Sequence, residues 1–187
     1  MPGPNGSALR VWDSVVRLIH WSMVASVAVA WLVTEGQIHD TAGYALLALI
    51  ALRIVWGFGG PDHARFASFV KTPRTVFQYT KQLYAGHEPR HIGHNPLGGW
   101  MIMALLATGL AASLSGWLYT TDALWGLAWV ERIHVFFAYL LLVLAALHIV
   151  GVVFTSFRQR ENLIASMVHG RKQVEDEGKS DKSALRD

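Results

Sequence analysis

The 187-residue chain contains no cysteine. It therefore has no disulfide, no cysteine-ligated iron–sulfur cluster and no covalently attached c-type haem. Charged residues are also scarce, at 16% of the sequence, whereas 52% of the residues are hydrophobic and the mean hydropathy is +0.31. A soluble domain of this size does not need so many long apolar runs. The composition indicates a small integral membrane protein.

Four apolar segments are long enough to span a bilayer: residues 15–34, 40–58, 97–117 and 133–156. The first is too long and too late in the chain for a cleaved signal peptide, and no small-residue cleavage site follows it before Glu35. We therefore predict an all-α membrane protein, a bundle of four transmembrane helices.

Charged residues predict the orientation of this bundle. Basic residues gather in the N-terminal flank with Arg17, in the connection between residues 53 and 90, and after the fourth span at Arg158 and Arg160. Of the five charges in the other two connections, four are acidic: Glu35, Asp40, Asp122 and Glu131, beside Arg132. Because basic residues accumulate in cytoplasmic loops, both termini are expected in the cytoplasm. The net charge of +3 and the pI near 9.4 follow from this topology, so we predict contact with membrane lipid and no nucleic-acid partner.

The segments outside the spans predict two further features. Residues 74–85 place apolar side chains at helical spacing, which favours a short interfacial helix lying on the membrane surface in the connection between spans two and three. Residues 171–187 are of mixed charge and nearly free of bulky apolar side chains, which is typical of a disordered cytoplasmic tail. Residues 1–170 are expected to form one membrane domain.

Histidines inside the spans carry the chemistry. His134 and His148 are 14 residues apart in one apolar run. At about 100° per residue they return to within roughly 40° of one direction, about 21 Å apart along the helix. Histidine within a span is costly and usually faces a bundle interior, and neutral imidazole is a common ligand of haem iron. Matched by depth, His20 pairs with His148 near the cytoplasm and His39 pairs with His134 near the outer face. The pattern predicts two b haems, each with its iron held by two histidines, although a lone histidine at the end of a span is more often an interfacial residue.

Three other polar residues lie near the expected cytoplasmic haem. Arg17 is one helical turn from His20, so it could bind a haem propionate or reach a lipid phosphate. Arg53 has the same two roles open to it. His94, where span three begins, could exchange protons with a quinone, whose reduction takes two protons for each electron pair. Alternatively, His94 simply flanks a helix start made by Asn95 and Pro96.

These residues resemble a known family. The motifs RLIHW at 17–21, RIVWGF at 53–58 and GHNPLGG at 93–99, with His39 and the pair His134 and His148, are similar to the bacterial di-haem cytochromes b561. That family is related to the cytochrome b subunits of nickel–iron hydrogenase and formate dehydrogenase. The resemblance covers residues 10–170. It implies a di-haem electron carrier of the bacterial inner membrane and the respiratory chain, with ligands from spans one, two and four and quinone exchange near the cytoplasmic haem.

The expected function is electron transfer between membrane quinone or quinol and a redox partner on the periplasmic side, such as a cytochrome c. A homodimer is compatible with this function. The chain is shorter than hydrogenase-linked members, which argues against a dedicated hydrogenase partner. Two alternatives stay open: a stand-alone superoxide:quinone oxidoreductase, for which Arg132 is the one basic residue expected at the outer face, and a non-redox four-helix membrane scaffold.

Overall fold

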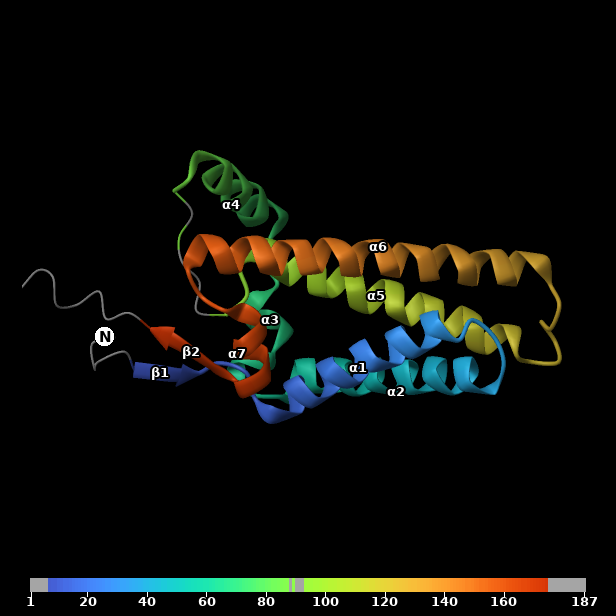
Figure 1. The fold of residues 1–187 in the computed structure, drawn as a ribbon. Helices are drawn as coiled ribbons and strands as arrows, with labels where there is room; N and C mark the ends of the chain where they lie inside the picture. Colours follow the sequence, from blue (N-terminus) through green and yellow to red (C-terminus); the bar gives the residue numbers. More distant parts are fainter. Residues whose placement is uncertain (1–6, 88, 90–92, 175–187) are drawn as a thin grey trace, which may run out of the picture.

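The computed structural model describes residues 7–87, 89 and 93–174. Four long helices run side by side: α1 (Ser14–Leu32), α2 (Gln37–Gly59), α5 (Pro96–Tyr119) and α6 (Ala128–Gln159) (Figure 1). All four are long and apolar enough to cross a membrane. The prediction of an all-α protein with four transmembrane helices is confirmed.

The shorter elements gather at one end of the bundle, together with both ends of the described chain (Figure 1). We call this the terminal end. The elements there are β1 (Ser7–Arg10), η1 (Asp62–Ala64), α3 (Phe66–Phe69), α4 (Pro73–Ala85), α7 (Leu163–His169) and β2 (Arg171–Val174). The opposite end, called the loop end, has the connections at residues 33–36 and 120–127.

Local sequence signals determine where the helices begin. The side chain of Asp13 accepts a hydrogen bond of 3.0 Å from the Val16 N–H at the start of α1. Asn95 does the same for the Gly98 N–H at 2.7 Å, and Pro96 is the first residue of α5. Such caps satisfy N–H groups that have no partner within the helix. The helix α4 is present within one residue of the predicted range, while its contact with a membrane surface stays a prediction.

The long helices pack in sequence order: α1 on α2, α2 on α5, and α5 on α6, whereas α1 and α6 are not a closely packed pair. Of the 32 residues of α6, Val130 and Leu141 alone are buried. Leu141 joins the buried apolar centre of the bundle with Leu46 and Ile50 of α2. It lies seven residues after His134 and seven before His148, so the apolar centre separates the two histidine levels.

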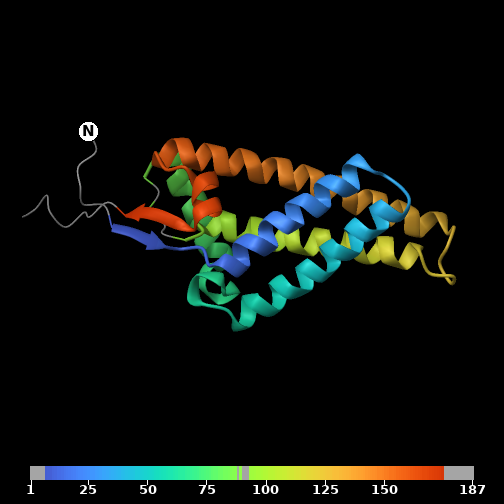
Figure 2. The same ribbon diagram turned by 60° about the horizontal axis from the view of Figure 1, so that its bottom comes forward.

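Two strands at the terminal end were not anticipated from the sequence. β1 pairs with β2 in antiparallel fashion, and the pair extends from the terminal end away from the long helices (Figure 2). The Val11 and Trp12 N–H groups donate to the Gly170 carbonyl at 3.0 and 3.2 Å, which fixes the start of the chain against the end of α7. Residues 171–174, the first four of the expected disordered tail, thus form a strand. The rest of that tail, residues 175–187, lies outside the described residues.

Candidate functional site

The histidines expected at the outer depth lie together at the loop end. His39 is the third residue of α2 and His134 is the seventh residue of α6. Their ring centroids are 5.9 Å apart and the ring planes are nearly perpendicular, at 86°. Two helices that do not follow each other in the chain therefore present imidazoles to one place, as depth matching predicts.

Backbone carbonyl groups hold both of these rings. The Nδ1 atom of His39 lies 3.0 Å from the carbonyl oxygens of Ala30 and Val33, and that of His134 lies 2.9 Å from the Ala112 oxygen. A carbonyl oxygen can only accept, so each Nδ1 carries the proton and donates. The Nε2 lone pair of each ring is then free to bind a metal, and histidine ligands are commonly oriented by such a second hydrogen bond.

Gly116 of α5 makes room for the His134 ring. A Cβ atom at this position would lie 3.0 Å from His134 Cε1 and 3.1 Å from Nδ1. These separations are tighter than ordinary contacts, so a side chain here would require the ring to shift. The glycine is needed because the imidazole packs directly on the backbone of α5.

The second pair of histidines lies at the terminal end in a different environment. His20 and His148 are partly buried and are near enough to interact electrostatically. Within the described part of the chain, neither ring has a hydrogen-bond partner such as those at the loop end. His20 instead contacts the edge of Trp21, with ring centroids 5.3 Å apart. The two histidines are thus neighbours, as expected from their depths, but no backbone carbonyl of the described residues holds either ring.

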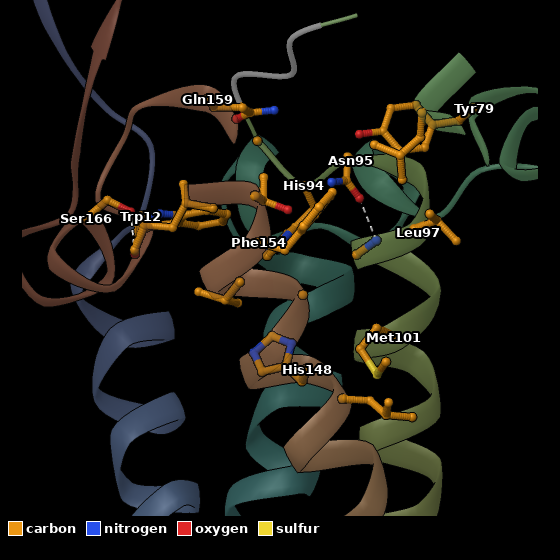
Figure 3. Close-up of a pocket in the computed structure, with 18 residues that line it drawn as sticks. Trp12, Tyr79, His94, Asn95, Leu97, Met101, His148, Phe154, Gln159 and Ser166 are labelled. Atoms are coloured by element: carbon orange, nitrogen blue, oxygen red, sulfur yellow. Dashed lines mark hydrogen bonds between the residues drawn. The ribbon is translucent and has the colours of Figure 1, made fainter. Parts of the chain in front are cut away.

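His148 faces a cavity of about 260 Å³ enclosed by α4, α5, α6, α7 and the segment before α1. His148 lies deeper in the bundle, and His94, Asn95 and Gln159 lie nearer the terminal end (Figure 3). Tyr79 of α4 also lines this space. The cavity combines an apolar wall with a few polar groups, which is the usual composition of a small-molecule site.

His94 occupies the aromatic side of this cavity. Its ring centroid is 4.5 Å from that of Trp12 and 5.1 Å from that of Phe69. Asn95 and Pro96 do form the start of α5, as the simpler interpretation of this motif predicted. His94 is nevertheless more than a flank, because it lines the cavity that His148 also lines.

Arg17 connects α1 to α7. Its guanidinium donates to the Val168 carbonyl and, at 3.1 Å, to the Ser14 hydroxyl. Its Nε atom is buried and has no hydrogen-bond partner among the described residues. A buried N–H donor of this kind suits an anionic group such as a haem propionate.

Arg53 is 6% exposed, which disfavours contact with lipid phosphate, one of the two roles expected for it. The side chain donates to the Ala64 carbonyl at 3.1 Å and lies over the Phe66 ring, 5.0 Å from its centroid. These contacts hold η1 and α3 against α2. The Nη1 atom is buried without a partner in the described chain, so this arginine also retains a donor.

Several residues that line the terminal-end cavity were not predicted from the sequence. Trp12 and Ser166 line it because the two ends of the described chain fold back on each other, and Gln159 lines it from the last turn of α6. Asn162 and Gly170, which cap α7, are a local signal that could have predicted this short helix. Nothing in the sequence indicates where α7 docks.

The remaining histidines fit their expected surface role where they are described. His63, His87 and His169 are exposed, and His91 lies outside the described residues. Among the described residues, no group of three or more His, Asp or Glu side chains could hold a bare metal ion. A haem iron takes only two axial ligands from the protein, and the loop-end pair fits this need.

Comparison with known proteins identifies the family. Four spanning helices with histidines inside them are typical of membrane-embedded cytochromes. The chain matches the family described as prokaryotic cytochrome b561 over residues 11–170, and it belongs to that family. It is therefore a multi-pass membrane protein that transfers electrons through b-type haem.

Two curated relatives are each named probable Ni/Fe-hydrogenase B-type cytochrome subunit. The protein of Bradyrhizobium diazoefficiens is 25% identical over 216 aligned residues, which cover 89% of this chain and 86% of the relative. The protein of Azotobacter vinelandii is 24% identical over 222 residues, covering 91% of each chain. No solved structure matches the chain significantly. Because the relatives are matched over nearly their whole length, chain length is no argument against a hydrogenase partner.

Proposed function

We propose that this protein carries electrons across the bacterial inner membrane between a redox partner at the loop end and quinone at the terminal end. The observation that carries the proposal is the loop-end pair, in which two imidazoles from different helices meet with both Nδ1 atoms already donating to carbonyls. Family membership supports electron transfer through b haem. The number of haems and their ligands are part of the proposal.

Two b haems are assigned to the two histidine levels. His39 and His134 would hold one iron, and His20 and His148 the other. Each haem supplies one-electron exchange at its iron when bound. The chain supplies the axial imidazoles and an apolar centre around Leu141 that keeps water out between the two levels. Arg17 and Arg53 each have a buried N–H group without a partner among the described residues, and these groups are suited to haem propionates at the terminal end.

Quinone exchange is assigned to the terminal-end cavity. His148 lines this cavity, so a quinone there would lie close to the second haem. His94 lines the same space, and histidine is a side chain that commonly transfers protons in catalysis. This supports a role for His94 in the two proton transfers that accompany quinone reduction.

The distribution of basic residues supports the proposed orientation of the bundle in the membrane. The basic terminal end faces the cytoplasm under the positive-inside rule, and α4 lies on that membrane surface. The loop end then faces the periplasm, where the redox partner docks. The names of the curated relatives make a membrane-associated hydrogenase one candidate partner, and a small cytochrome c is another.

Stand-alone oxidation of superoxide is disfavoured by the charges at the loop end. Four of the five charged residues there are acidic, with Arg132 as the basic one. An anionic substrate would be repelled from this surface. The non-redox scaffold is inconsistent with membership of a cytochrome family.

A reduced-minus-oxidised spectrum with pyridine-haemochrome quantitation tests the proposal. We expect about two b haems per chain, and the loss of a different one in His39→Ala and in His148→Ala. His63→Ala is the matched control, because His63 is exposed and belongs to neither pair. A protein without haem, or one whose haem content does not respond to His148, would contradict the proposal.

A further inference from the structure

The two histidine pairs differ in what fixes their rings, and this difference has an electrochemical consequence. We propose that Gly116 and the carbonyl groups behind His39 and His134 give the loop-end haem a lower midpoint potential than the terminal-end haem. The inference rests on the ligand assignment proposed above. It assigns to Gly116 the role of a positioning residue, acting through His134.

Hydrogen bonds from Nδ1 make a histidine ligand more basic. An imidazole that donates strongly through Nδ1 gives more electron density to the metal through Nε2. This favours ferric over ferrous iron, so it lowers the midpoint potential. Both loop-end rings have such bonds, at 3.0 and 2.9 Å, whereas the described chain provides none for His20 or His148.

The acceptors behind His39 are strong ones. Ala30 and Val33 lie in the last turn and at the C-cap of α1. Carbonyl groups there lack intrahelical partners and carry the negative end of the helix dipole. His39 thus caps α1, and the four-residue connection at 33–36 holds the ring in this position.

Gly116 allows the hydrogen bond between His134 Nδ1 and the Ala112 carbonyl oxygen. The ring lies against the α5 backbone, where its Nδ1 reaches the Ala112 oxygen at 2.9 Å. A methyl group at position 116 would meet Cε1 at 3.0 Å and Nδ1 at 3.1 Å, which forces the ring away by a few tenths of an ångström. The glycine therefore permits a close ring-to-backbone contact that lengthens when a side chain is added.

Net charge acts in the same direction as these hydrogen bonds. Four of the five charged residues near the loop end are acidic, and negative charge favours the oxidised, more positive iron. At the terminal end, Arg17 and Arg53 have buried N–H groups without a partner in the described chain, and positive charge favours the reduced iron. The helix dipoles nearly cancel at both ends, because neighbouring helices run in opposite directions. Electrons would thus pass downhill from the loop end to the terminal end.

A potentiometric titration of the holoprotein in phospholipid nanodiscs tests the order of the potentials. We expect two one-electron reduction steps whose midpoint potentials differ by at least about 59 mV, which corresponds to a tenfold difference in equilibrium constant. The haem that remains in His148→Ala should titrate with the lower step, and the haem that remains in His39→Ala with the higher step. Two haems in the reverse order would overturn this inference alone. Wild-type protein without two haems would overturn the proposed function as well.

Gly116→Ala tests the positioning role directly. We expect the lower step to move to higher potential while the upper step and the haem content stay unchanged. Gly109→Ala is the matched control: it lies one heptad earlier on α5, and its Cβ would meet Ile50 Cδ1 at 3.1 Å, far along the helix from His134. An equal shift in both variants, or none in Gly116→Ala, would show that Gly116 does not act through His134. If the Gly116→Ala variant binds no loop-end haem, the order of the midpoint potentials in His148→Ala and His39→Ala tests the inference instead.

Discussion

The loop end and the terminal end of this bundle each hold a pair of histidines, but the two pairs are built differently. At the loop end, both rings donate to backbone carbonyls, and their centroids are 5.9 Å apart with the ring planes nearly perpendicular. At the terminal end, His148 lines a cavity of about 260 Å³ with several polar groups. The first arrangement suits a group that stays in place, and the second suits a ligand that enters and leaves. The proposed exchange of electrons with a diffusing quinone needs both arrangements.

The chain connections explain this difference. The loop end is made by short connections, so the last carbonyls of α1 lie beside the first turn of α2. The terminal end is made by the long segment between α2 and α5 and by both ends of the described chain, which meet through contacts such as the hydrogen bond from the Val11 N–H to the Gly170 carbonyl. Local geometry fixes one end, whereas long-range contacts shape the other.

The largest expected effect comes from removing one histidine of a pair. His134→Ala should reduce the haem content from about two to about one per chain, because an iron that has lost an axial imidazole binds weakly. His39→Ala should remove the same haem, and the double variant should lose no more than either single variant. Haem-to-protein ratios from pyridine-haemochrome spectra measure this. A double variant without any haem would show that the two residues serve different sites.

His94→Ala should affect the terminal end alone. We expect quinol-dependent reduction to fall by about 100-fold, the usual scale for loss of a proton-transferring side chain, while both haem signals persist. Stopped-flow reduction by a soluble quinol measures the rate. His87→Ala is the control, since this exposed histidine lies in the same connection. Equal rates in the two variants would remove His94 from the quinone site.

Sequence reasoning succeeded where local information was sufficient. The four spans follow from length and hydropathy, and the loop-end pair follows from the matching depths of His39 at the start of the second span and His134 at the start of the fourth. The terminal-end cavity could not be predicted, because Trp12 and Ser166 meet only through the strand pair and α7. Likewise, the long-range partner of Arg17 is the backbone carbonyl of Val168, and a backbone carbonyl has no signature in the sequence.

Two glycine-to-alanine variants, one at each end of the bundle, test whether the backbone contacts of Gly170 hold the ends of the described chain together. Gly170 has φ +81°, and a Cβ there would lie 2.7 Å from the Trp12 oxygen, so Gly170→Ala should release the chain ends at a cost of about 1–3 kcal/mol. Gly126 at the loop end has φ +74° and open space around it, so Gly126→Ala adds the same backbone strain without the clash. Limited proteolysis should cut the N-terminal segment about tenfold faster in Gly170→Ala than in Gly126→Ala. Equal cleavage rates in the two variants would mean that the contacts of Gly170 do not protect the N-terminal segment from the protease.

The smallest expected effect is electrostatic. Asp40 follows His39 directly and is partly buried. Removing its negative charge in Asp40→Asn should raise the midpoint potential of the loop-end haem by less than about 59 mV, which corresponds to a tenfold change in equilibrium constant. Asp62→Asn is the control at the terminal end, where Asp62 is paired with Arg65 at 3.3 Å in an exposed position. The shift in Asp40→Asn should shrink as salt is added, because screening acts over about 10 Å at 0.1 M. A shift independent of salt would indicate that Asp40 acts by holding the His39 ring, and would place the origin of the low potential in geometry instead of charge.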